Sequence, residues 1–160
     1  MAGSGNTDMQ IRDNTVVFTH DYDAPRDLVF ETWTDKDLIP SWWGSEGFTT
    51  VVEKMEVKPA GAWRFIQRDA AGKEYAFHGI YHDVSRPCRI VSTYEYEGMP
   101  GKVILDTITF DELPGSKTRL TSYSVFQSKD DLDGMLEENM EDGSKKSYER
   151  LGDLLSKFLL

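Results

Sequence analysis

Six short runs rich in β-branched and aromatic residues follow one another between Phe48 and Phe126, with only brief gaps between them. The gaps consist of residues that interrupt strands, such as Pro59-Ala60-Gly61 and Pro114-Gly115-Ser116. Connections of a few residues join antiparallel neighbours, whereas parallel strands need much longer crossovers. The pattern therefore predicts an antiparallel meander. Its expected strands are FTTVVEKMEV (48–57), AWRFIQR (62–68), YAFHGIYHDV (75–84), RIVSTYEY (89–96), KVILDTITF (102–110) and TRLTSYSVF (118–126).

Another strand and two short helices are expected before the meander. The strand is TVVFTHDY (15–22), whose composition is typical of β-structure. The first helix follows Asp23-Ala24-Pro25, because proline suits the first position of a helix. The second opens at Thr34 to Asp37, which resembles a capping box, and ends at Pro40.

The segment from about Lys129 to the end predicts one long amphipathic helix. Ser128 and Asp131 have the spacing of an N-cap pair. Gly134 and Gly143 indicate either a helix that flexes to admit a ligand or one bent to follow a curved sheet. A helix of this length, about 45 Å if continuous, needs the sheet as its partner. Its apolar or small stripe consists of Leu132, Leu136, Met140, Gly143, Ser147, Leu151, Leu154 and Phe158.

Length and composition fit one globular domain. The chain has 160 residues, of which 39% are hydrophobic and 29% charged. Residues 1 to about 12 are small and polar, so we expect a disordered leader over 1–12 and a single domain over 13–160.

Charge and apolar patterning exclude several kinds of partner. The net charge of -10, without a cluster of Lys and Arg, argues against nucleic acid and anionic membranes. No stretch approaches the roughly 20 apolar residues of a membrane span. Cys88 is the single cysteine, so no intramolecular disulfide can form. We therefore expect a cytoplasmic protein, with Cys88 as a small buried or half-buried residue and not a reactive thiol.

The order of elements resembles the helix-grip fold of the START-like, or SRPBCC, superfamily, and more specifically its branch named after the activator of heat-shock protein ATPase. The resemblance covers about residues 14–158 and implies an α+β fold, in which a curved antiparallel β-sheet wraps around a long C-terminal α-helix, with two short helices after the first strand. It rests on DAPRDLVFETWTD (23–35), WWG (42–44) with Gly47-Phe48, PAGAWRF (59–65), GIYHDVSRPCRIV (79–91), TITF (107–110), TRLT (118–121) and DGMLEENMEDG (133–143).

The superfamily includes lipid carriers, polyketide cyclases, hormone receptors and co-chaperones, so the fold alone does not fix the function. What the resemblance implies is a cavity between sheet and helix. Trp42 and Trp43 precede the sheet between Pro40 and Gly44, where one indole can cap the core while the other closes the cavity. The alternative is that both indoles fill the core.

Strand and helix periodicity extends this set to a predicted ligand pocket. Aromatic residues that alternate along a strand share one face, although such a stripe is also typical of ordinary core. The predicted pocket residues are Trp42, Trp43, Met55, Trp63, Phe65, Phe77, Tyr81, Tyr94, Tyr96, Met135, Met140 and Tyr148.

A metal site or a cofactor site is not expected. His78 and His82 have a metal-like spacing, but on a strand they lie about 13 Å apart, too far to share one ion. Nucleotide-binding glycine loops and the Gly-x-Ser-x-Gly elbow are absent from the sequence. A buried carboxylate could still act as an acid or base, but the sequence does not determine whether Glu53, Glu56, Glu74 or Asp106 faces inward.

We therefore expect a protein that binds a small apolar or aromatic molecule in the cavity, without metal or cofactor. A polyketide cyclase or dehydratase acting in the same cavity is one alternative, although no residue demands catalysis. The other is a co-chaperone-like domain that activates a chaperone ATPase. The resemblance implies a chaperone partner for that role, but the eukaryotic relative also uses a second domain, which the expected organisation of this chain lacks.

Overall fold

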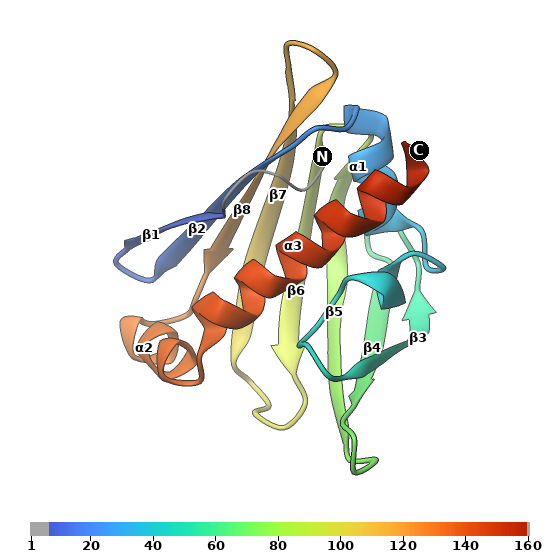
Figure 1. Cartoon of the computed structure of the whole chain (residues 1–160). Helices are drawn as coiled ribbons and strands as arrows, with labels where there is room; N and C mark the ends of the chain where they lie inside the picture. Colours follow the sequence, from blue (N-terminus) through green and yellow to red (C-terminus); the bar gives the residue numbers. More distant parts are fainter. Residues whose placement is uncertain (1–6, 160) are drawn as a thin grey trace.

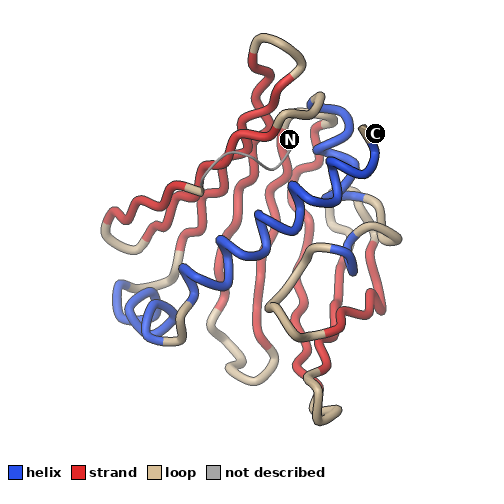
Figure 2. The backbone as a smooth tube through the Cα atoms, in the orientation of Figure 1, coloured by secondary structure: helices blue, strands red, loops and turns tan. Residues whose placement is uncertain are grey.

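One antiparallel sheet of eight strands forms the body of the molecule, and the helices lie on one side of it (Figures 1 and 2). The computed structural model describes residues 7–159. Across the sheet the strand order is β1-β2-β8-β7-β6-β5-β4-β3. The strands are β1 (Asp8–Arg12), β2 (Thr15–Tyr22), β3 (Thr49–Met55), β4 (Ala62–Arg68), β5 (Glu74–Ser85), β6 (Arg89–Tyr96), β7 (Val103–Leu113) and β8 (Lys117–Val125).

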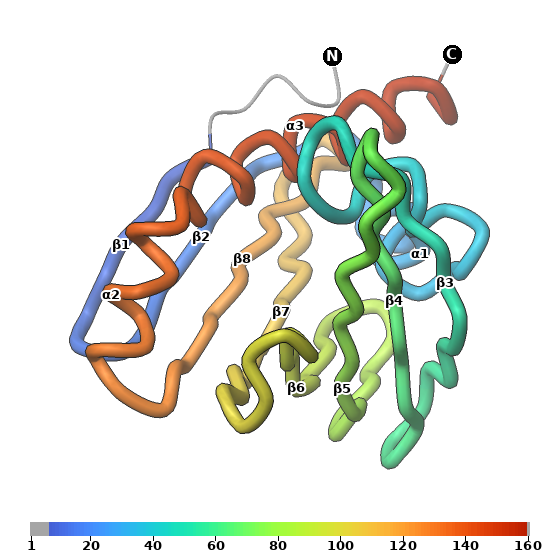
Figure 3. The backbone as a smooth tube through the Cα atoms, turned by 90° about the horizontal axis from the view of Figure 1, so that it is seen from below, coloured from blue at the N-terminus to red at the C-terminus, as the bar shows by residue number. Residues whose placement is uncertain are grey.

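The antiparallel meander from β3 to β8 is confirmed. Every neighbouring pair in it is antiparallel, and β4 and β6 begin and end at the predicted residues. The sheet bends into an open arch, with the long C-terminal helix crossing its concave side (Figure 3). This is the predicted helix-grip architecture.

The expected leader is partly ordered. Residues 8–12 form β1, which pairs with β2 in the register Met9 to Phe18 and Ile11 to Val16. The pairing arises because β2 offers unpaired backbone N–H and C=O groups that a short strand can satisfy. The rest of the expected leader, residues 1–6, lies outside the described residues.

The first short helix is present, but the second is not. Helix α1 (Arg26–Thr34) follows Pro25, which occupies its N-cap. The predicted second helix is replaced by turns and one short 3-10 turn, η1 (Ile39–Ser41), which contains Pro40. The Asp35 carboxylate accepts a hydrogen bond from the backbone N–H of Asp37 at 2.9 Å, so these residues stabilise a turn and not a helix start.

The C-terminal segment forms two helices instead of one. Helix α2 (Lys129–Glu137) begins at Ser128, whose hydroxyl accepts the predicted bond from the N–H of Asp131 at 3.1 Å. Helix α3 (Met140–Phe158) starts after Asn139, which adopts a left-handed conformation with φ of 65°. Asparagine tolerates this conformation better than most residues, and it is incompatible with a continuous helix. The break therefore lies between Gly134 and Gly143.

Helix α3 is fixed to the sheet by burial and by specific hydrogen bonds. Leu151 and Leu155 are fully buried. The hydroxyl of Tyr22 on β2 donates to the backbone carbonyl of Tyr148 at 2.9 Å, and Ser147 donates to the carbonyl of Trp42 at 2.8 Å. Within residues 7–159, no helix has the length and apolarity needed to cross a membrane.

Candidate functional site

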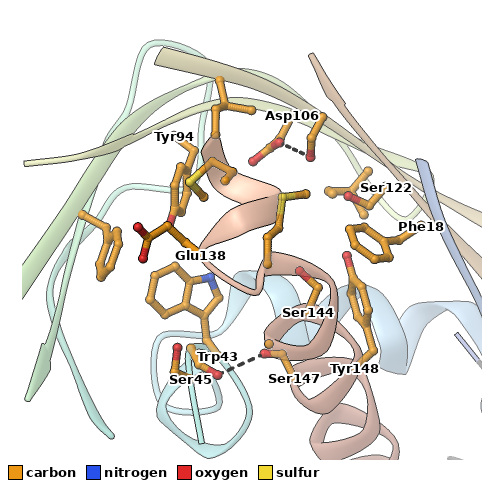
Figure 4. A pocket seen from close by; sticks show the side chains of 18 of the residues that line it. Phe18, Trp43, Ser45, Tyr94, Asp106, Ser122, Glu138, Ser144, Ser147 and Tyr148 are labelled. Carbon is orange, nitrogen blue, oxygen red and sulfur yellow. Dashed lines mark hydrogen bonds between the residues drawn. The ribbon is translucent and has the colours of Figure 1, made fainter. Parts of the chain in front are cut away.

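A cavity of about 380 Å³ lies between the concave face of the sheet and the helical segment from Met135 to Tyr148. Figure 4 shows Asp106 and Ser122 on the sheet side, Trp43 opposite Asp106, and Tyr148 projecting from α3. The C-terminal helical segment does not pack against the sheet along its whole length. At Asn139 the chain changes direction, so α2 does not continue along the axis of α3.

The two neighbouring tryptophans have different roles, although both contact the cavity. Trp42 is 2% exposed and its indole N–H donates to the carbonyl of Thr32 at 2.9 Å, so it is a core residue whose polar group is satisfied. Trp43 is half-buried at the cavity wall. Its ring packs edge-to-face against Phe65 and Phe77, at centroid distances of 5.0 and 5.5 Å. The WWG sequence thus places one indole in the core and the other in the wall.

The predicted pocket residues fall into three places. Seven line the cavity: Trp42, Trp43, Phe77, Tyr94, Met135, Met140 and Tyr148. Trp63, Phe65 and Tyr81 line a smaller neighbouring space of about 70 Å³. Trp43, Tyr94 and Asp106 border both spaces, so the two spaces are adjacent.

Met55 and Tyr96 lie outside both spaces. Met55, at the end of β3, borders a surface depression together with Arg86 and residues of α1. Tyr96 shares a sheet face with Tyr94 but lies further along β6, where its ring contacts Phe77 at a centroid distance of 5.1 Å. A Cβ at Gly98 would lie 2.4 Å from the Tyr96 ring, so this ring packs on the glycine and not on the cavity.

Asp106 is the acidic side chain of β7 that lines the cavity. Strand alternation places it in phase with Ile104, Ile108 and Phe110, all of which are buried. Its carboxylate accepts a hydrogen bond from the hydroxyl of Ser124 at 2.7 Å. The side chain retains some accessible surface because it borders the cavity, yet protein surrounds it deep in the fold.

Burial raises the pKa of Asp106 to about 7, and the hydrogen bond from Ser124 opposes this rise only in part. Burial likewise raises the pKa of Tyr94 beyond its usual range, and that of Tyr148 to about 12. Both phenols are therefore neutral near pH 7. The cavity combines apolar walls with one carboxyl group that can exchange a proton near neutral pH.

The other three carboxylates whose orientation was open face outward. Glu53 pairs with Arg64 at 2.6 Å, and Glu74 pairs with Arg68. Glu56 accepts a bond from the backbone N–H of Ala62 at 3.3 Å and is also exposed. Asp106 is thus the member of this set that can take part in cavity chemistry.

The histidines do not converge. His20 is buried on β2 and stacks on Tyr22 at a centroid distance of 4.2 Å; burial lowers its pKa. His78 and His82 lie on β5, and His78 contacts Glu97 at 2.9 Å. Cys88, which was expected to be buried or half-buried, is exposed. Among residues 7–159, no group of three or more His, Cys, Asp or Glu side chains is placed to hold a metal ion.

Several polar residues of the cavity were not identified from the sequence. They are small or amide side chains: Ser45, Gln67, Ser122, Ser124, Ser144 and Ser147. The alternation of Leu120, Ser122 and Ser124 along β8 could have indicated the two serines of the sheet. Trp33 and Phe18 also contact the cavity, from α1 and β2.

The family model described as "Activator of Hsp90 ATPase homolog 1-like protein" matches residues 23–156. No curated protein matches the chain significantly.

Several bacterial proteins of solved structure are similar to this chain. A protein from Mycobacterium smegmatis matches with a TM-score of 0.84 and 20% identity, over 94% of this chain and 96% of that one. One from Arthrobacter aurescens matches with a TM-score of 0.86 and 21% identity, over 94% and 91%. One from Rhodobacter sphaeroides has a TM-score of 0.88 and 17% identity, over 95% and 99%. At these identities the likeness shows the START-like fold.

Proposed function

Because the chain belongs to the family of Activator of Hsp90 ATPase homolog 1-like proteins, which is associated with small-molecule binding or chaperone interaction, we propose that it binds one small, mainly apolar molecule in the cavity beneath α3. The observation that carries this proposal is the cavity itself, of about 380 Å³. Ligand pockets in proteins occupy roughly 300–1,000 Å³ and combine apolar walls with a few polar anchors.

The lining favours a flat guest. The rings of Trp43, Phe77 and Tyr94 form one wall, with Trp43 to Phe77 at 5.5 Å and Phe77 to Tyr94 at 5.6 Å between centroids. The thioethers of Met135 and Met140 also line the cavity, and such flexible side chains adapt to the shape of a guest. A planar aromatic body therefore matches this cavity better than a branched aliphatic one.

The test uses 1-naphthalenemethanol, a neutral planar probe, in isothermal titration calorimetry. Ser144 on α3 lines the cavity, so Ser144→Phe fills it while Ser144→Ala leaves it open (Figure 4). The wild type and Ser144→Ala should bind the probe, and Ser144→Phe should lose binding while it retains a cooperative thermal transition. Equal binding by the wild type and both variants, or binding by none of the three proteins, would overturn the proposal.

An enzymatic use of the same cavity has one supporting observation. The pKa of Asp106, raised to about 7 by burial, suits a general acid or base near neutral pH. A cyclase or dehydratase reaction would then depend on this carboxyl group. Turnover of a polyketide-like probe by the wild type, with loss of turnover in Asp106→Asn, would favour this alternative over simple binding.

The family description supports a chaperone partner as a further alternative. Stimulation of a purified chaperone ATPase by this protein would favour that role. An unchanged ATPase rate over a titration would remove it.

A further inference from the structure

The charged groups at the cavity all have the same sign. Asp106 points into it from β7, and Glu138 lies at its rim between α2 and α3 (Figure 4). Among the described residues that line the cavity, none is Lys, Arg or His. Arg150 of α3 is not part of the lining. It donates a hydrogen bond to the backbone carbonyl of Gly44, which does line the cavity.

Within residues 7–159, the groups that face Asp106 from the neighbouring elements are neutral. In the sheet it lies between Ser92 of β6 and Ser124 of β8. The titratable groups near it are the phenols of Tyr94 from β6 and Tyr148 from α3, both of which are uncharged near pH 7. Ser124 supplies one hydrogen bond at 2.7 Å. The protein therefore buries a carboxyl group without giving it a positive partner, an arrangement that favours the neutral form until a cation enters.

The walls of the cavity suit such a cation. Aromatic faces carry negative partial charge and attract an ammonium group within about 6 Å of the ring centre. Trp43, Phe77, Tyr94 and Tyr148 present rings to the cavity around Asp106. The net charge of -10 adds a general attraction for cations and a repulsion for anions.

On the basis of the proposed binding function, we infer that the guest is a protonated organic amine, with a planar apolar body against the aromatic wall and its ammonium group paired with Asp106. The amine supplies the positive charge that the cavity lacks, and the carboxylate accepts its hydrogen bonds. A fatty acid or another carboxylate would place a second negative charge beside Asp106 and Glu138, so such anions should be rejected.

A matched series of probes tests the charge preference. It consists of 1-naphthylmethylamine, 1-naphthalenemethanol and 1-naphthoate, which share one ring system and are cationic, neutral and anionic near pH 8. Calorimetry at this pH should give the amine an affinity at least about tenfold above that of the alcohol, the advantage of a charged hydrogen bond. The naphthoate should bind more weakly than the alcohol.

The preference should depend on pH with a defined sign. Between pH 5.5 and pH 8 the amine stays protonated while Asp106 loses its proton. The affinity of the protein for the amine should therefore rise, because the carboxylate attracts the ammonium group. The affinity of the alcohol should not rise with it. Glu138 is exposed at the rim, and the two tyrosines remain neutral throughout this range.

Two variants separate the local pairing from the overall field. Asp106→Asn keeps the size of the side chain and should remove the preference for the amine while alcohol binding persists. Glu149→Gln removes an exposed carboxylate from α3 and so changes the net charge equally, but it should preserve the preference. If the alcohol binds and the amine binds no better, the inference of an amine is overturned while the binding function stands. If none of the probes binds, both fail.

Discussion

The hydroxyl of Tyr22 on β2 donates a hydrogen bond to the backbone carbonyl of Tyr148 on α3 at 2.9 Å, and both side chains are buried. The bond joins residues that lie 126 positions apart. Tyr148 itself lines the cavity, so this contact holds one wall of the site against the first long strand. The same helix that encloses the cavity is therefore fixed to the sheet at its middle.

Replacing Tyr22 by Phe should weaken this attachment. The substitution removes the hydroxyl while it keeps the ring, so the free energy of unfolding should fall by about 1 kcal/mol, the net contribution of a typical hydrogen bond. Urea denaturation measures the change. A stability equal to that of the wild type would show that the bond contributes nothing to holding α3.

Asp106→Asn should change how stability depends on pH. Burial raises the pKa of Asp106 from 3.8 to about 7 in the folded protein. Below about pH 4 the carboxyl is protonated in both folded and unfolded chains, so it imposes no ionisation penalty. Between pH 4 and 7 only the unfolded chain releases the proton, so wild-type stability falls as pH rises, and above pH 7 the loss is constant.

The amide of the variant does not ionise, so the wild type should lose stability relative to Asp106→Asn between pH 4 and 8. An increase of about three in pKa corresponds to at most about 4 kcal/mol. Because Asp106 borders the cavity, solvent screening lowers the expected difference to about 2 kcal/mol. Denaturation curves of both proteins at several pH values measure the difference. A difference that stays constant, or one of opposite sign, would contradict the burial of an unpaired carboxyl.

Gly79 should not tolerate alanine. A Cβ there would lie 1.8 Å from the carbonyl oxygen of Thr93 and 2.5 Å from the indole nitrogen of Trp63. The absence of a side chain allows the Trp63 indole to donate to that carbonyl, at 3.2 Å. Gly79→Ala should destabilise the protein by about 1–3 kcal/mol or more, because backbone must move to admit the methyl group.

Gly134→Ala is the matched control for Gly79→Ala. A Cβ at Gly134 would meet nothing within 4 Å, and the position is exposed in α2. Alanine there should leave stability unchanged or raise it by up to about 1 kcal/mol, since it favours helix. Thermal unfolding of both variants should separate them clearly. Equal melting temperatures would show that the sheet accommodates a side chain at Gly79.

The sheet was predictable because turn-forming residues separate its strands in the sequence. Between β4 and β5, and between β5 and β6, turn residues leave little freedom in where each strand ends. The break at Asn139 was not predictable, since apolar spacing continues through it and only the left-handed backbone marks it. Strand β1 was also missed, because a short polar segment becomes a strand only through pairing with β2.

The aromatic part of the site could be foreseen from alternation, but its polar part could not. Trp43, Phe77 and Tyr94 occur in phase with other apolar residues, so their common face follows from strand geometry. Asp106 lies in a strand with apolar residues on both faces, and its direction depends on how β7 pairs with β6 and β8. The volume left open depends on the path of the helices after Asn139, which no local pattern specifies.

Whether a guest occupies the cavity can be measured most directly at the methionine methyl groups. Met135 and Met140 line the cavity, whereas Met55 and the exposed Met99 lie outside it. In a protein labelled with 13C at these methyls, titration with 1-naphthylmethylamine should shift the NMR signals of Met135 and Met140 and show Overhauser contacts from them to the naphthalene ring. Shifts confined to Met55 and Met99, or an unchanged spectrum at saturating amine, would contradict a guest between the sheet and α3.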